Sequence, residues 1–174
     1  MARAREVLIF VGLIGALGAV GHLVARRTGA PPAQPLAVGP SAWSIPPDDP
    51  RLGERAYAQC RGCHQPDGAG IPGTYPPLAG NPRVLGESTA LIRIALQGFD
   101  SRQPDGPALW PLAMPGLGAR MADHELAGAL SFIRGQWGNA QPPITAAEVA
   151  RVRARTALRQ RPWTPTELAA PRPP

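Results

Sequence analysis

The chain has 174 residues, including 23 prolines and 20 glycines, and its formal net charge at pH 7 is +6. This length allows one domain of ordinary size with extensions, and the high proline and glycine content indicates a loop-rich protein. Its two cysteines exclude a disulfide-stapled scaffold and a four-cysteine metal site.

The positive charge is distributed unevenly, and all 18 basic residues are arginines. Residues 1–43 carry a net charge of +3, residues 44–139 carry −1 and residues 140–174 carry +4. The middle of the chain is therefore nearly neutral. This distribution does not favour nucleic-acid binding, but the basic C-terminal part suits an anionic lipid or an acidic partner.

Residues 1–27 are interpreted as an N-terminal membrane anchor. Val7–Val24 is an uncharged stretch of 18 residues. As a helix it would span about 27 Å, close to the thickness of the hydrocarbon core of a bilayer. A cleaved signal peptide is the alternative, but cleavage after Ala19 would place the bulky Leu17 at the −3 position, and cleavage after Ala30 would place Pro31 at the +1 position. The balanced flanking arginines do not fix the orientation of the segment.

Residues 28–47 are predicted to be a linker, because they combine many prolines with small residues that bury little apolar surface. In a polyproline conformation this linker would reach at most about 60 Å. The predicted globular domain covers residues 48–139. Residues 140–174 are predicted to form a basic C-terminal helix and a disordered tail.

Two helices are predicted in the first part of the domain. One opens near Asp49, which can cap it, with Pro50 at the first helical position. The other is Ser88–Gln97, whose apolar residues share one face; Ser88 would cap it and Gly98 would end it. Glycine- and proline-rich loops surround these helices, and no segment shows the alternation of a strand.

Two further helices are predicted towards the C-terminus. Asp123–Trp137 has Asp123 at its N-terminal end, where a negative charge is favourable. The tail helix begins at a capping-box pattern of Thr145 and Glu148, and Pro162 would stop it. The last twelve residues are proline-rich and are predicted to be disordered.

Residues 60–64 read CRGCH, the pattern of covalent c-type haem attachment. Cys60 and Cys63, three positions apart at a helix end, can reach the two vinyl groups of one porphyrin. His64 then lies beneath the ring and offers a nitrogen to the iron. A zinc site would need two more ligands, a thioredoxin-like pair would need a βαβ pattern, and a disulfide between residues three apart is uncommon. We therefore predict one covalent haem c.

Met114 is the predicted second axial ligand. It lies fifty residues after His64, and Pro115 prevents helix formation and would keep the segment extended against the ring. A methionine thioether gives a six-coordinate iron of relatively high potential. Met121 and His124 are the alternatives, but Met121 suits packing before the last helix and His124 suits the surface at its start.

These residues resemble a class I cytochrome c over residues 48 to about 137. In that family the first helix carries a small residue that contacts an aromatic residue of the last helix. Gly53, Tyr57 and Phe132 stand at the matching spacings. The resemblance implies a small all-α cytochrome c fold, with three or four helices wrapped with loops around one covalent haem. Here that domain is preceded by the predicted transmembrane helix.

A Pro-x-Leu-x-Gly segment follows the haem motif in this family, and here it is Pro76, Leu78 and Gly80. The resemblance implies that the backbone carbonyl oxygen of Pro76 accepts the ring proton of His64 and that Leu78 packs on the haem. Met114 with the proline after it matches the usual axial Met-Pro pair. The predicted haem-binding residues are therefore the following: Cys60, Cys63, His64, Pro76, Leu78 and Met114.

The C-terminal part of the domain, residues 125–139, looks like the single-haem domains of cytochrome subunits that serve membrane-bound dehydrogenases of alcohols, aldehydes or sugars. Those subunits usually carry three haem domains, whereas this chain has one C-x-x-C-H motif. These motifs identify the fold strongly and the partner weakly.

The sequence predicts an electron carrier rather than an enzyme. With His64 and Met114 at both axial positions, the iron offers no site to a small-molecule substrate. We expect a membrane-tethered single-haem cytochrome in a respiratory chain. It would link a periplasmic or membrane dehydrogenase, or another cytochrome, to a downstream acceptor such as a terminal oxidase. The alternatives are a haem-containing docking subunit of a larger dehydrogenase or oxidase complex, and a haem sensor or enzyme with a displaceable Met114.

The resemblance also implies a location, because covalent haem attachment in bacteria takes place outside the cytoplasm. We expect a single-pass protein of the inner (cytoplasmic) membrane with its haem domain on the periplasmic side. Cleavage of the N-terminal segment would instead give a soluble periplasmic protein.

Overall fold

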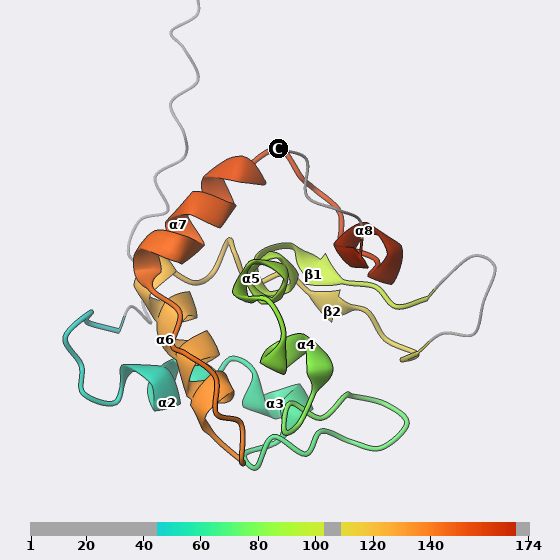
Figure 1. Ribbon diagram of the computed structural model, residues 1–174, viewed down its shortest axis with the longest axis horizontal. Helices are drawn as coiled ribbons and strands as arrows, with labels where there is room; N and C mark the ends of the chain where they lie inside the picture. Colours follow the sequence, from blue (N-terminus) through green and yellow to red (C-terminus); the bar gives the residue numbers. More distant parts are fainter. Residues whose placement is uncertain (1–44, 103–108, 170–174) are drawn as a thin grey trace, which may run out of the picture. The chain divides into compact units, whose positions relative to one another are not determined.

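A computed structural model describes residues 45–102 and 109–169 of the chain (Figure 1). Within these residues the helices and strands follow one another in this order: α2 (Leu52–Tyr57), α3 (Arg61–His64), α4 (Pro82–Leu85), α5 (Ser88–Gln97), β1 (Gly98–Phe99), β2 (Met114–Pro115), α6 (Asp123–Gly135), α7 (Ala146–Arg155) and α8 (Pro165–Ala169). The fold is mostly helical, as the sequence predicts, and long loops join the short elements.

The predicted membrane anchor, residues 1–27, and nearly all of the predicted linker, residues 28–47, lie outside the described residues. Among residues 45–102 and 109–169, no helix is long and apolar enough to cross a membrane. The predicted boundaries between the segments of the chain stay predictions.

Helix α2 begins three residues after Asp49, so the predicted cap is displaced. Its N-cap is Arg51. The Oδ1 atom of Asp49 accepts the backbone N–H of Arg51 at 2.8 Å, and its carboxylate also pairs with Arg55. Asp49 therefore closes the turn that leads into the helix instead of capping the helix itself.

Helix α2 lies close against α6, and two glycines make this approach possible. A Cβ atom on Gly53 would lie 2.9 Å from the carbonyl oxygen of Gly128 and 3.0 Å from Cβ of Phe132. A Cβ atom on Gly128 would lie 2.8 Å from Cγ of Leu52. The ring of Tyr57 packs beside that of Phe132, with centroids 5.3 Å apart. The contact implied by the family resemblance is therefore present.

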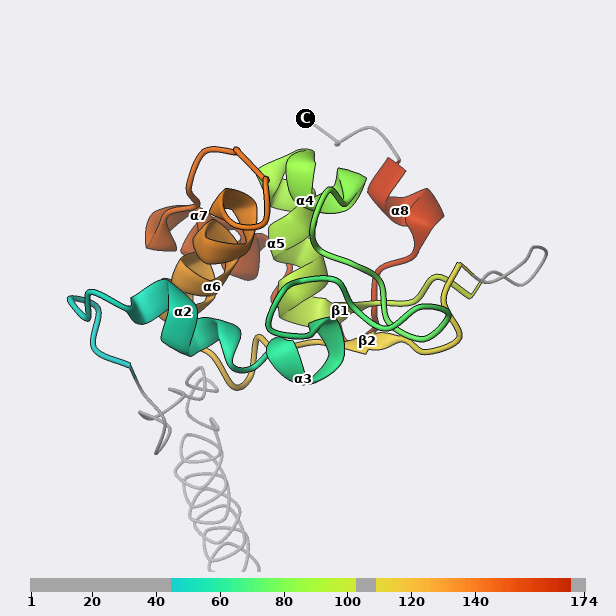
Figure 2. The ribbon, with the colours of Figure 1, turned by 90° about the horizontal axis from the view of Figure 1, so that it is seen from below.

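Helix α5 lies between α6 and α7 on one side and α8 on the other (Figures 1 and 2). It has the predicted bounds, and its predicted inward face is buried at Leu91, Ile92 and neighbouring positions. Its N-cap is Glu87, so Ser88 is its first helical residue and not its cap. Gly98 ends the helix with a φ of 91°, which favours glycine.

Helix α6 ends two residues earlier than predicted, and its N-cap is Ala122 instead of Asp123. Glu125 supplies the capping interactions: Oε2 accepts the backbone N–H of Ala122 at 2.8 Å, and Oε1 accepts that of Ile45 at 2.7 Å. Asp123 instead accepts a hydrogen bond from Nε of Arg153 at 2.7 Å. The acidic first turn therefore joins α6 to two other parts of the domain.

The sequence does not predict the short strands β1 and β2. They pair antiparallel, with Gly98 opposite Pro115 and Phe99 opposite Met114. Each strand has two residues, which is too few to show an alternating pattern. The mostly helical fold is as expected, and the loop that carries Met114 adds one short strand pair that the sequence did not predict.

The C-terminal segment packs onto the domain. Helix α7 has the predicted capping box, in which Thr145 Oγ1 accepts the Glu148 N–H at 3.2 Å and Glu148 Oε2 accepts the Thr145 N–H at 2.8 Å. It ends at Arg155, before Pro162, and contacts both α6 and α5. The expectation of disorder over the last twelve residues does not hold for Pro165–Ala169, which form α8.

We expect Gly53→Ala to lower the free energy of unfolding by about 1–3 kcal/mol, because the new methyl group must displace the α6 backbone or Phe132. Gly135→Ala in α6 is the matched control, since a Cβ atom there has no neighbour within 4 Å. Thermal unfolding of the purified full-length protein measures both variants. Equal melting temperatures for the two variants would contradict the close helix contact.

Candidate functional site

One cavity brings together the four residues to which the sequence assigns haem attachment and ligation. Cys60, Cys63, His64 and Met114 all line it. Cys60 is the N-cap of α3, Cys63 and His64 lie at the end of that helix, and Met114 lies in β2. The loop around Pro76 borders the same cavity. The walls are mainly apolar and include the following side chains: Leu78, Val84, Leu91, Ile94, Leu117, Leu126, Leu130 and Ile133.

The alternative ligands do not line this cavity. Met121 is 4% exposed and belongs to the hydrophobic core. His124 is engaged elsewhere, with its Nε2 atom 2.7 Å from the carbonyl oxygen of Ile45. Of the three residues considered from the sequence, Met114 is therefore the one that the fold brings to the cavity.

His64 is fixed by burial and by one hydrogen bond from its ring. His64 is 7% exposed, and its Nδ1–H donates to the carbonyl oxygen of Pro76 at 2.9 Å. This is the hydrogen bond that the family resemblance implied. Burial lowers the pKa of His64 and so favours the neutral imidazole. With Nδ1 occupied, Nε2 is the ring nitrogen available to a metal.

The loop that carries Pro76 is fastened to the end of α6 by Asn139, a residue that sequence reasoning missed. The buried Asn139 side chain accepts the Gly80 N–H at 2.9 Å and donates to the carbonyl oxygens of Leu78 at 3.2 Å and Ile133 at 2.8 Å. Two of these bonds join residues 59 and 61 positions apart. No local pattern could have indicated them.

Backbone contacts with β1 and with the end of α5 position Met114. Strand β2 pairs with β1, where a Cβ atom on Gly98 would lie 2.4 Å from the carbonyl oxygen of Met114. Two residues after β2, the N–H of Leu117 donates to the carbonyl oxygen of Ala95 at 2.8 Å and ties the segment to the last turn of α5. The glycine after α5 therefore permits the close approach of the methionine strand.

The two cysteines are free, Cys60 being buried and Cys63 exposed. Burial, together with the neighbouring Cys63, raises the pKa of the Cys60 thiol to about 11. Within the described ranges there is no group of three or more His, Cys, Asp and Glu side chains that could hold a metal ion. Two thiols, an imidazole and a thioether therefore make up the donor set of the cavity.

Several polar side chains at the cavity were not singled out from the sequence, among them Tyr75, Asn81 and Arg83. The Arg83 guanidinium carbon lies 4.4 Å from the centroid of the Phe99 ring, and burial lowers the pKa of Arg83. Apolar walls with a few polar groups suit a large ligand that is mostly apolar and carries charged substituents. Together with the donor set, they fit a haem.

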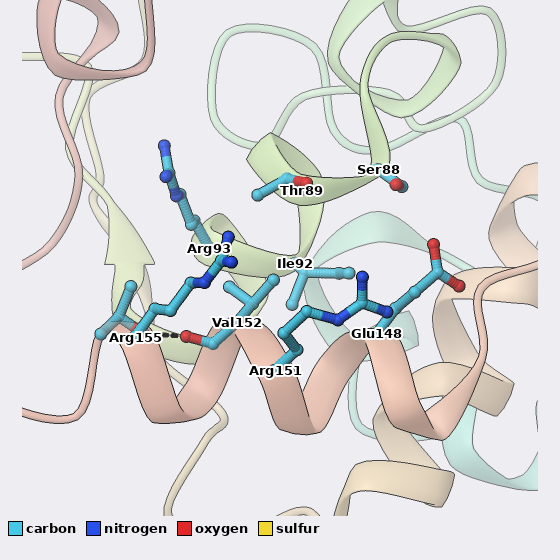
Figure 3. A pocket seen from close by; sticks show the side chains of 9 residues that line it. Ser88, Thr89, Ile92, Arg93, Glu148, Arg151, Val152 and Arg155 are labelled. Atoms are coloured by element: carbon cyan, nitrogen blue, oxygen red, sulfur yellow. Dashed lines mark hydrogen bonds between the residues drawn. The ribbon is translucent and has the colours of Figure 1, made fainter. Parts of the chain in front are cut away.

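A second pocket lies between α5 and α7 (Figure 3). It is bordered by Arg93 of α5 and by Glu148, Arg151 and Arg155 of α7. None of its lining residues lines the haem-type cavity. We therefore assign it no part in binding that group.

Comparison with known proteins identifies the family. The cytochrome c family model matches residues 51–137, a range that contains the C-x-x-C-H motif and Met114. Cytochrome c-552 of Thermus thermophilus is 37% identical over 112 residues, which cover 59% of this chain and 85% of that protein. The chain belongs to the cytochrome c family. Covalently bound haem c is the cofactor of this family, and the donor set found here fits it.

Two longer cytochromes c are similar to this one. The cytochrome c subunit of a quinone alcohol dehydrogenase from Gluconacetobacter polyoxogenes is 37% identical over 123 residues, 70% of this chain. The cytochrome c subunit of gluconate 2-dehydrogenase from Pantoea cypripedii is 37% identical over 110 residues, 61% of this chain. The chain spans a quarter of the length of each of these subunits, since the matches cover 25% of them.

We expect Gly98→Ala to disturb this cytochrome at Met114, because the added methyl group must push the Met114 carbonyl away. With Met114 as ligand, the sulfur-to-iron charge-transfer absorption of the ferric protein should weaken while the haem stays covalently attached. Gly135→Ala serves again as the control, because it adds a methyl group in open space. An unchanged band in Gly98→Ala would show that the approach of β1 does not set the position of the methionine.

Proposed function

We propose that this cytochrome is a membrane-tethered, single-haem electron carrier. The observation that carries the proposal is the meeting of Cys60, Cys63, His64 and Met114 around one largely apolar cavity. The chain contains one C-x-x-C-H motif, so one haem is expected. When bound, a haem supplies an iron that accepts and returns one electron.

The residues of the chain have distinct roles in this proposal. Cys60 and Cys63 would attach the porphyrin through thioether bonds, and His64 and Met114 would ligate the iron. Pro76 orients the His64 ring through the hydrogen bond to Nδ1. Because these two side chains would leave no open position on the iron, a haem held here would be suited to electron transfer and not to binding a substrate.

The apolar walls of the cavity affect the reduction potential. Ferric haem carries one more positive charge than ferrous haem, and an environment with little water disfavours the more charged state. Leu78 and the buried residues of α5 and α6 therefore raise the potential, and a methionine ligand acts in the same direction. We infer a cytochrome of relatively high potential.

Residues 1–27 supply the tether in this proposal, with the haem domain on the periplasmic side of the inner membrane. The support comes from the uncharged stretch Val7–Val24 and from the chemistry of c-type haem attachment. The proline-rich residues 28–47 would allow the haem domain to move between partners.

The donor is proposed to be a dehydrogenase or another cytochrome, and the acceptor a downstream component such as a terminal oxidase. The relatives named as cytochrome c subunits of alcohol and gluconate dehydrogenases support a dehydrogenase partner. The same names favour a second candidate function, a haem-containing docking subunit that stays bound to a larger dehydrogenase complex.

We expect Met114→Ala to remove the sulfur-to-iron charge-transfer absorption, lower the reduction potential and let carbon monoxide bind the ferrous protein readily at neutral pH. Met121→Ala is the matched control, because Met121 packs in the core away from the cavity. Optical spectra and a redox titration of the two purified variants test the ligand assignment. Ready binding of carbon monoxide by the unmodified protein would favour a sensor or enzyme instead.

We expect the full chain to fractionate with membranes and to resist extraction by high salt. Replacing residues 1–27 by an efficiently cleaved signal peptide should release a soluble protein with the same haem spectrum. Recovery of the unmodified chain as a soluble protein that begins after residue 27 would establish cleavage and exclude the tether.

A further inference from the structure

The free edge of strand β1 is covered by a segment near the C-terminus that we call the C-terminal clamp, residues 159–167. The N–H of Trp163 donates to the carbonyl oxygen of Gly98 at 3.0 Å, and the N–H of Asp100 donates to that of Trp163 at 2.8 Å. Phe99 and Trp163 thereby form a parallel bridge. Strand β1 thus pairs with the clamp on one side and with β2, which carries Met114, on the other.

The side chain of Trp163 adds contacts with the end of α5. Its Nε1–H donates to Oε1 of Gln97 at 3.1 Å, and Gln97 in turn donates from Nε2 to Oγ1 of Thr156 at 2.7 Å. The guanidinium carbons of Arg159 and Arg93 lie 3.7 and 5.1 Å from its ring centroid. The indole therefore sits against two cations and one amide, which fixes its orientation.

Glu167 of α8 binds three other residues of the clamp. Its Oε2 atom accepts from Nη2 of Arg159 at 2.6 Å and from the N–H of Thr164 at 3.0 Å, and its Oε1 atom lies 2.6 Å from Nη2 of Arg161. The hydrogen bond from Arg159 is the main cause that lowers the pKa of Glu167 to about 2, so the carboxylate is ionised at neutral pH. Arg159 is thereby held against the Trp163 ring.

We propose that Trp163 is a positioning residue for the axial methionine: through β1, the clamp holds the strand that presents Met114 to the haem. A ribbon of two strands with two residues each is unstable by itself. A third paired segment restrains β1, and β1 restrains β2 through the Phe99–Met114 pairing. The inference rests on the proposed role of Met114 as an iron ligand.

None of the clamp residues lines the cavity, and the backbone of Trp163 pairs with β1, so the effect of the clamp should be confined to the methionine side of the haem. Loosening it should weaken the bond between Met114 and the iron without releasing the haem or displacing His64. A merely stabilising tail would lower the melting temperature and leave the iron coordination of the folded protein unchanged.

The test uses the full-length holoprotein and imidazole, an added ligand that competes with Met114 for ferric iron. Trp163→Ala removes the ring, and Trp163→Phe keeps an aromatic ring but lacks the N–H. Leu158→Ala is the matched control, because Leu158 directly precedes the clamp in the sequence and is 96% exposed. Imidazole titrations and the sulfur-to-iron charge-transfer band are measured on protein that is shown to be folded by circular dichroism.

We expect the imidazole affinity of Trp163→Ala to rise by about tenfold, with a smaller rise for Trp163→Phe and none for Leu158→Ala. The charge-transfer band should weaken in the same order. Imidazole affinities that match the unmodified protein in both Trp163 variants would overturn the proposal. So would an equal rise in Leu158→Ala.

Two further results keep the outcome unambiguous. If Trp163→Ala does not yield folded holoprotein, Trp163→Phe and Glu167→Gln decide, because each weakens the clamp and keeps most of its packing; unchanged imidazole affinity in both would reject the inference. If Met114→Ala binds imidazole no more tightly than the unmodified protein, the proposed ligand assignment itself fails, whatever the Trp163 variants do.

Discussion

The approach of α2 to α6 at Gly53 and Gly128 is the contact on which the haem site depends. Where backbone meets backbone this closely, neither helix can shift without opening a void or forcing a clash. Helix α2 leads within one turn to Cys60, and α6 supplies cavity-lining residues such as Leu126 and Leu130. The crossing of α2 and α6 therefore fixes the position of the attachment cysteines relative to one wall of the cavity, and the loops pack around this crossing.

Several arginines hold those loops in place through internal hydrogen bonds and ion pairs, so their positive charges are not all available to a binding partner. Arg134 is 5% exposed and donates to the carbonyl oxygens of Val84 at 2.7 Å and Pro142 at 3.0 Å. Arg153 binds α6 through an ion pair, and Arg159 is engaged by Glu167 and by an aromatic ring. Part of the positive charge near the C-terminus therefore serves internal structure and is less available to an anionic lipid or partner than its position suggested.

Local signals in the sequence predict the parts of the site that depend on neighbouring residues. The apolar face of Ser88–Gln97 and the spacing of the C-x-x-C-H motif are of this kind, and both appear as expected. The contacts of Asn139 escape prediction because they join loops far apart in the chain. The C-terminal clamp could not be predicted because Trp163 lies in a proline-rich stretch whose composition resembles that of a disordered tail. The structure shows instead that Glu167 and Thr164 exchange hydrogen bonds at the start of α8.

The pairing of α2 with α6, and of the Pro76 loop with Asn139, has a consequence for the order of folding. Both contacts join the beginning of the domain to its end, so the chain must close a long loop before either can form. As the chain is synthesised, helix α2 before the cysteines has no partner until α6, in the last third of the domain, has followed. The attachment motif therefore stays open to other molecules until α6 and Asn139 have been made, and their packing is the event that encloses it.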